Sequence, residues 1–103
     1  MSTSEAKIIT KRFAGLLKSR KFPVASIYLF GSYARGDFRK WSDIDIAVVS
    51  KFKKHNEKTA MSLMFLRHEV DDRIEPHYFI NKDFKDDGNI LAQEIRKNGI
   101  KII

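Results

Sequence analysis

The sequence contains no cysteine, so disulfide bonds and thiolate metal sites are excluded. Its three histidines, His55, His68 and His77, show no spacing typical of zinc ligands, and no zinc site is expected. No apolar run approaches the roughly 20 residues that span a membrane, and residues 1–5 lack the apolar core of a signal peptide. These absences predict a cytoplasmic protein with no membrane partner.

Acidic residues are also scarce relative to basic ones. The chain has 13 Asp and Glu against 20 Lys and Arg, a net charge of +7, and the excess is concentrated in residues 1–24 and 51–58. A basic surface attracts nucleotides, nucleic acids and acidic protein faces alike, so charge alone does not decide the function. With 103 residues, the chain has the length for one core, and a single domain over residues 1–103 is expected.

The order of apolar patterns predicts alternating helices and strands. Helices are expected at residues 2–20, 56–67 and 88–98, the last followed by Gly99 as a cap, with a short helical turn at 32–35. Strands are expected at residues 25–30, 43–49 and 73–80, and Pro76 favours an edge position or a bulge for the third. This order predicts an α/β (α+β) fold, a small mixed sheet of about three strands with helices packed on it.

Capping and core positions follow from the same patterns. Ser2 and Glu5 fit a capping box at the start of the first helix. Met61, Met64 and Phe65 are expected to face inward from helix 56–67. The remaining side chains expected in the core, on periodicity, are Ile8, Phe13, Phe30, Ile46, Val48, Phe79, Leu91 and Ile95.

Asp43 and Asp45 are separated by one residue at the start of the expected strand 43–49. Side chains alternate along a strand, so both carboxylates project from one face while Ile44 and Ile46 face the other way. Like charges this close repel unless a cation neutralises them, and hard divalent ions prefer carboxylate and phosphate oxygens. The pair is a candidate metal site; solvated aspartates at a strand start are the alternative.

Gly31 and Ser32 lie where strand 25–30 ends and the helical turn begins. Free backbone N–H groups point outward at such a place, and glycine lets the backbone approach an anion closely. The Ser32 hydroxyl adds one more donor. Phosphate binding is one interpretation, and a plain strand-to-helix turn capped by Ser32 is the other.

These two elements occur together, with ten residues between Ser32 and Asp43. The pattern Gly-Ser-x10-Asp-x-Asp, with Arg35 in the loop and Ser42 before the first aspartate, resembles the signature of the DNA polymerase β-like nucleotidyltransferase superfamily. The segment Gly-Ser-Tyr-Ala-Arg-Gly-Asp most resembles the corresponding motif of the minimal nucleotidyltransferase (MNT) family of bacteria and archaea. The motif covers residues 27–49, and the order of the flanking elements extends the resemblance, and the polymerase β-like fold it implies, to nearly the whole chain.

The resemblance implies a role for each matching residue. Gly31 and Ser32 would hold a triphosphate, and Arg35 would meet its oxygens. Asp43 and Asp45 would bind metal, two Mg²⁺ ions with Mn²⁺ as the alternative, and so form part of the catalytic set.

The family also has a third metal-binding carboxylate, usually an aspartate, on a later strand. The match here is Glu75, which departs from the family by one methylene group. Asp71 and Asp72 are fallback candidates, although both precede the strand. His77 alternates onto the side of Glu75, but it is left out of the catalytic set.

The activity that the resemblance implies is transfer of a nucleoside monophosphate, AMP from ATP, onto an acceptor hydroxyl. The resemblance also implies that the acceptor is a tyrosine of a HEPN-type toxin partner and that the transferase acts as its antitoxin. Two alternatives remain: a non-catalytic antitoxin that neutralises its partner by complex formation, and a basic nucleic-acid-binding domain with a degenerate site. The sequence does not choose the nucleotide or the acceptor, and it leaves homo-oligomer formation open.

Overall fold

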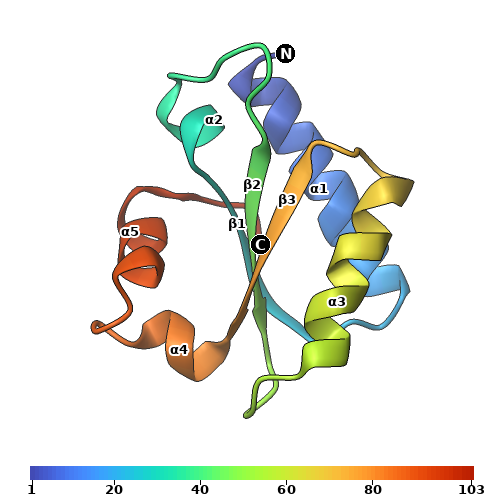
Figure 1. The fold of residues 1–103 in the computed structure, drawn as a ribbon, viewed down its shortest axis with the longest axis vertical. Coiled ribbons are helices and arrows are strands. Elements are labelled where there is room, and N and C mark those ends of the chain that lie inside the picture. Colours follow the sequence, from blue (N-terminus) through green and yellow to red (C-terminus); the bar gives the residue numbers. More distant parts are fainter.

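A four-stranded sheet organises the computed structural model, which describes residues 1–103 (Figure 1). The order of its strands across the sheet is β3-β2-β1-β4. The elements in chain order are α1 (Thr3–Ser19), β1 (Val24–Phe30), α2 (Ser32–Arg35), β2 (Ile44–Ser50), α3 (Glu57–Leu66), the 3-10 turn η1 (Arg67–Glu69), β3 (Ile74–Ile80), α4 (Asn81–Lys85), α5 (Ile90–Asn98) and β4 (Ile100–Lys101).

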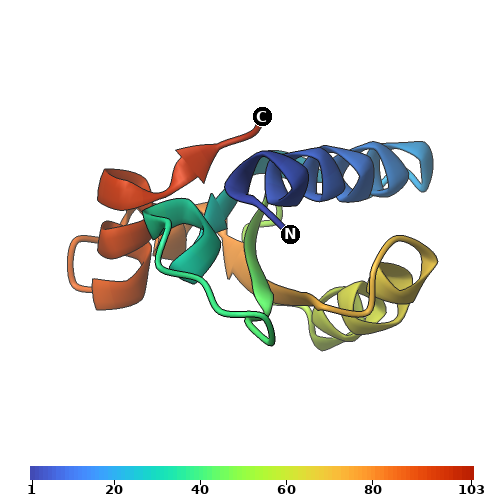
Figure 2. The same ribbon diagram turned by 90° about the horizontal axis from the view of Figure 1, so that it is seen from above.

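The sheet separates two groups of buried side chains, so the helices form a layer on each face (Figures 1 and 2). Helices α1 and α3 cover one face and bury residues such as Phe13 and Leu63 against Ile46 and Val48. Helices α4 and α5 cover part of the other face, where Ile95 packs with Val49 and its neighbours. The expected α/β class is therefore confirmed, with one strand more than the three expected.

Strand direction decides which ends meet. β1 and β2 are antiparallel, whereas β2 and β3 are parallel and joined through α3. The β2–β3 register runs without a break from Ile44 opposite Ile74 to Ser50 opposite Ile80. Pro76 thus lies on an edge strand, as expected, and introduces no bulge; the irregularity of the sheet is in β1, between Val24 and Ser26.

The predicted helix ends are largely confirmed. The Ser2 side chain accepts a hydrogen bond from the backbone N–H of Glu5, and Asn56 caps α3 in the same way. Gly99 ends α5 with its N–H bonded to the carbonyl of Ile95, but in an extended rather than a left-handed conformation. Helix α4 and strand β4 were not predicted, because elements of five and two residues carry too little periodicity to be seen.

Several expected core positions are wrong. Met61, Met64 and Phe65 are exposed on α3, because this helix contacts the sheet through Leu63 instead. Ile8 is exposed on α1, whose inner face consists of Ala6, Thr10, Phe13, Ala14 and Leu17.

The remaining expected core positions fall into two groups. Leu91 is exposed on α5, and Phe30 is only half-buried at the end of β1. The other members of the expected core are buried, namely Phe13, Ile46, Val48, Phe79 and Ile95. No helix is both long enough and apolar enough to cross a membrane.

Candidate active site

The ends of strands β1, β2 and β3 lie side by side at one end of the sheet. Because β1 is antiparallel to β2 and β3 is parallel to it, the C-terminal end of β1 lies beside the N-terminal ends of β2 and β3. The chain leaves β1 through Gly31 and enters β2 just after Asp43. The expected strand start is thus corrected by one residue: Asp43 precedes β2, while Asp45 lies within it.

Residues from these strands form a row across one face. In the register, Phe30 is opposite Asp45 and Asp45 is opposite Glu75. His77 lies two residues after Glu75 on β3 and therefore on the same face. It stands between Glu75 and Phe79, which belongs to the buried apolar cluster of this face. The opposite face of β2 and β3 holds Ile44, Ile74 and their buried neighbours. The alternation expected for β3, with Glu75, His77 and Phe79 together, is present.

The polar side chains converge closely. Asp45, Glu75 and His77 each offer one ligand atom, and these atoms lie within 4.8 Å of one another. His77 Nε2 is 3.3 Å from Asp45 Oδ1 and 3.9 Å from Glu75 Oε1. Asp43 lies near enough to Glu75 to raise the pKa of its carboxyl group. Two carboxylates of the Asp-x-Asp pair and a third from the next strand thus occupy one small region.

The pKa of Glu75 shows that little positive charge balances the carboxylates of this cluster. The hydrogen bond with Asp43 raises the pKa of Glu75, and partial burial and the charge of Asp45 raise it further, while His77 opposes them. Like-charged carboxylates are held together here with only one histidine near them. A donor set of closely spaced carboxylates fits a hard divalent cation.

Gly31 brings the backbone against this cluster. Its φ of 75° lies in the region that favours glycine, and a Cβ added there would collide with the Asp45 carboxylate. A glycine is therefore required at this point for two separate reasons, conformation and space. Gly36, at the other end of α2, has a φ of 86° but open space around a Cβ, so only conformation favours glycine there.

Helix α2 follows directly. Its first residue is Ser32, and the carbonyl of Gly31 accepts hydrogen bonds from the N–H groups of Ala34 and Arg35. The N–H groups at the beginning of such a turn have no partner within it and face outward. Arg35 is exposed and its Nε donates to Asp37 at 3.2 Å, so this structure does not bring its guanidinium to the carboxylates.

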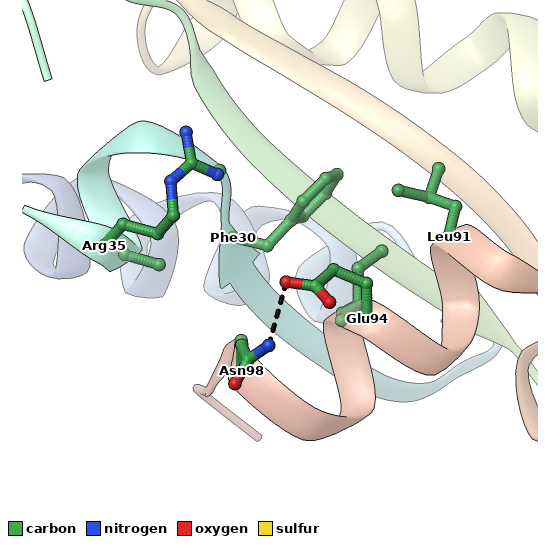
Figure 3. A pocket seen from close by; sticks show the side chains of 9 residues that line it. Phe30, Arg35, Leu91, Glu94 and Asn98 are labelled. Carbon is green, nitrogen blue, oxygen red and sulfur yellow. Dashed lines mark hydrogen bonds between the residues drawn. The ribbon is translucent and has the colours of Figure 1, made fainter. Parts of the chain in front are cut away.

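A small pocket of about 150 Å³ lies between α2 and α5 (Figure 3). Phe30 and Gly31 line it from the end of β1, and Arg35 projects from α2. On α5, Asn98 donates a hydrogen bond to Glu94 across the pocket wall. Its volume is below the roughly 300 Å³ at which ligand pockets usually begin, so it is too small to enclose a whole small-molecule ligand.

The neighbouring acidic and aromatic residues lie outside the cluster. Asp71 pairs with Arg73 at the start of β3, and Asp72 contacts His68, so neither fallback carboxylate is needed to complete the cluster. Tyr33 is buried and stacked on Phe38. Trp41 is 80% exposed two residues before Asp43, which leaves it accessible to a ligand or a partner.

His77 lies in the cluster, although its sequence position alone gave no reason to place it in the catalytic set. Its placement beside Glu75 was predictable from alternation, but not its approach to Asp45, which depends on how β2 and β3 are paired. Its ring meets that of Phe30 in a T-shaped arrangement, with ring centroids 4.9 Å apart. No sequence motif reports such a cross-strand contact.

The mixed sheet, with a Gly-Ser turn and clustered carboxylates at one end, is the arrangement that the sequence resemblance implies for a nucleotidyltransferase. The family model described as "Nucleotidyltransferase domain" matches residues 11–102, and the chain belongs to this family. Two Methanocaldococcus jannaschii proteins with the provisional name of protein adenylyltransferase are similar to it. One is 51% identical over 47 residues, 45% of this chain and 46% of that protein; the other is 49% identical over 53 residues, 52% and 50%. The chain therefore matches about half the length of these curated relatives.

Solved structures agree with the fold. A toxin-antitoxin crystal structure with AMP-PNP aligns with a TM-score of 0.68 and 25% identity, over 91% of this chain and 72% of that one. A complex of a tri-AMPylated HEPN toxin with an MNT antitoxin, from Shewanella oneidensis, aligns with a TM-score of 0.62 and 22% identity, over 95% and 71%. The resemblance to minimal nucleotidyltransferases within the polymerase β-like superfamily is thus confirmed.

Proposed function

We propose that this chain transfers a nucleoside monophosphate, AMP from ATP, onto an acceptor hydroxyl in a reaction that needs a divalent metal. The observation that carries the proposal is the convergence of Asp45 and Glu75 beside Gly31, with Asp43 near enough to raise the pKa of Glu75. The family assignment and the relatives named as adenylyltransferases support the same reaction.

The roles of the residues follow from their places. Asp43, Asp45 and Glu75 would hold the metal, two Mg²⁺ ions in the simplest form. Bound divalent ions neutralise the phosphate charge and lower the pKa of an attacking hydroxyl. The turn from Gly31 to Ser32 would receive the triphosphate through its outward N–H groups and the serine hydroxyl, and Arg35 would exchange Asp37 for phosphate oxygens.

The reaction is an in-line displacement at the α-phosphorus. The acceptor oxygen forms a bond to that phosphorus, and the bond from it to the oxygen bridging to the β-phosphate breaks. Pyrophosphate leaves with the electron pair of that bond, and the hydroxyl proton passes to a carboxylate of the cluster. No covalent enzyme intermediate is needed, because positioning and charge stabilisation dominate phosphoryl transfer.

The acceptor we propose is a tyrosine of a HEPN-type partner protein, with this chain as the antitoxin. The support is that two structural neighbours are toxin-antitoxin complexes, one of them with an AMPylated HEPN toxin. The small, open pocket between α2 and α5 is consistent with a partner that completes the site. The net charge of +7 would favour binding to an acidic face.

The test incubates the chain, the protein encoded by the neighbouring gene and each labelled nucleoside triphosphate with Mg²⁺ or Mn²⁺. Mass spectrometry of both proteins then reads out the modification. We expect AMP on the partner, lost in Asp43→Asn/Asp45→Asn and retained in the matched control Asp72→Asn, which lies outside the cluster. Transfer by the double variant would refute the site. Neutralisation of the partner without any modification would favour inhibition by complex formation instead.

A further inference from the structure

The cluster contains a group that differs in kind from the carboxylates. His77 is the one nitrogen donor in the set of Asp45, Glu75 and His77. Its side chain is 28% exposed, similar to that of Asp45 at 25%. The imidazole is therefore set into the cluster at the same depth as the central carboxylate.

The contacts of the ring fix which of its atoms faces the carboxylates. Nε2 is the nitrogen within 3.3 Å of Asp45 Oδ1 and within 3.9 Å of Glu75 Oε1. Phe30 packs edge-on against the ring, which restricts its rotation away from the cluster. The β2–β3 register places Asp45 directly opposite Glu75, so both carboxylates are held on the same side of Nε2.

These separations suit ligation of one ion. For an ion bound at roughly 2.1 Å, neighbouring ligand atoms lie about 3 Å apart and opposite ones about 4 Å apart. The distances of 3.3 and 3.9 Å fall in this range, and all three atoms lie within 4.8 Å of one another. Small side-chain rotations would bring all three to a common centre.

We propose that Nε2 of His77 is a direct ligand of the divalent cation held by Asp45 and Glu75, and that the site therefore prefers a first-row transition-metal ion, Mn²⁺ among them, to Mg²⁺. Imidazole nitrogen favours transition metals, whereas sites of oxygen ligands alone accept Mg²⁺ readily. The inference rests on the metal dependence in the proposed function, and it concerns which ion fills the site.

A competing arrangement has the same apo geometry. In it, His77 donates a hydrogen bond from Nε2 to Asp45 and only orients that carboxylate, while the ion is bound by oxygen alone. Removal of the imidazole would then weaken Mn²⁺ and Mg²⁺ binding by similar factors. Direct ligation predicts instead a loss specific to the transition metal, and a nitrogen in contact with the ion.

The experiment uses the metal-free chain with Mn²⁺ alone, without nucleotide, so that no ligand nitrogen contributes. Pulsed electron paramagnetic resonance should detect coupling from a directly bound imidazole nitrogen. We expect this coupling in the wild type and in His68→Ala, whose histidine contacts only Asp72 in a separate region, and its loss in His77→Ala. Calorimetric titrations of both ions should show that His77→Ala lowers the ratio of Mn²⁺ to Mg²⁺ affinity by at least about tenfold.

A second variant guards against a folding defect. His77→Glu replaces the nitrogen donor by a carboxylate oxygen on a side chain of similar reach and should abolish the nitrogen coupling while retaining Mg²⁺ binding. Absence of nitrogen coupling in the wild type, or an equal loss of both ions in His77→Ala, would overturn the inference. The outcomes remain separable from the proposed function: nitrogen-bound Mn²⁺ without nucleotidyl transfer would refute the function alone, and transfer without nitrogen coupling would refute His77 ligation alone.

Discussion

The repulsion within the carboxylate cluster leads to a prediction: without metal, Glu75→Gln should be more stable than the wild type, and with metal the wild type should be the more stable. Glu75→Gln removes one charge from a group whose ligand atoms lie within 4.8 Å of one another. Two unit charges at that distance repel by about 1 kcal/mol in water and by roughly 3 kcal/mol at an effective dielectric constant of 20. The Glu75 side chain is 47% exposed, so solvent screening favours the lower value.

The direction of the pH dependence follows from the raised pKa of Glu75, whose largest cause is its hydrogen bond with Asp43. A carboxyl group with a raised pKa binds its proton more tightly in the folded state, so ionisation destabilises the fold. This penalty is absent below the unfolded-state value near 4.5 and complete above the folded-state value. Without metal, Glu75→Gln should therefore be more stable than the wild type by about 1 kcal/mol at pH 8, and equal to it near pH 3.

Divalent metal should reverse this order. An ion at 100 times its dissociation constant stabilises the protein that binds it by about 2.7 kcal/mol. The wild type gains this fully and Glu75→Gln gains less, so the curves of unfolding free energy cross as Mn²⁺ or Mg²⁺ is added. Urea denaturation at pH 8, with EDTA and with saturating metal, measures both states.

The control for this experiment is Glu69→Gln. Glu69 pairs with Arg20 on the surface at 2.6 Å, away from the cluster, so its loss should cost about 0–1 kcal/mol equally with and without metal. If Glu75→Gln is as destabilising in EDTA as in metal, the cluster is not under electrostatic strain and the reasoning is refuted.

Two further predictions concern the turn and the start of β3. Gly31→Ala should lower the free energy of unfolding by about 1–3 kcal/mol and weaken metal binding, because its Cβ meets the Asp45 carboxylate. Gly36 has a similar φ but open space around a Cβ, so Gly36→Ala should cost about 1 kcal/mol and leave metal binding unchanged. Denaturation and metal titration compare the two variants. Asp71→Asn should cost about 1 kcal/mol at neutral pH. The hydrogen bond from Arg73 lowers the pKa of Asp71, so this difference should shrink as pH falls below 3.8.

Some of this structure was predictable because local chemistry dictates it. The Asp-x-Asp pair, the capping role of Ser2 and the alternation of Glu75 with His77 depend only on neighbours in sequence. The edge position of Pro76 followed from its missing N–H group, and the sheet order bears it out. Helix α3 was misjudged because apolar residues occur on most of its sides, so periodicity did not reveal that Leu63 alone is fully buried.

What could not be predicted depends on contacts between segments far apart in the sequence. The sequence of residues 74–80 does not indicate that Glu75 pairs with Asp45 rather than with Ala47 or Asp43. The parallel register of β3 with β2 determines this pairing. A shift of the register by two residues would preserve both apolar faces, and the alternation would look the same. It would nevertheless separate Glu75 from Asp45.

The placement of His77 adds a constraint on the same register. His77 is opposite Ala47 on β2, a small side chain that leaves space for the ring to lean toward Asp45. Phe30, opposite Asp45 on the other side, fills the space behind the ring. The geometry of the Asp45, Glu75 and His77 cluster thus depends on a small residue and a large one as much as on the acidic residues. A search for carboxylate motifs alone would find the acidic members of the cluster but neither His77 nor the residues that pack around it.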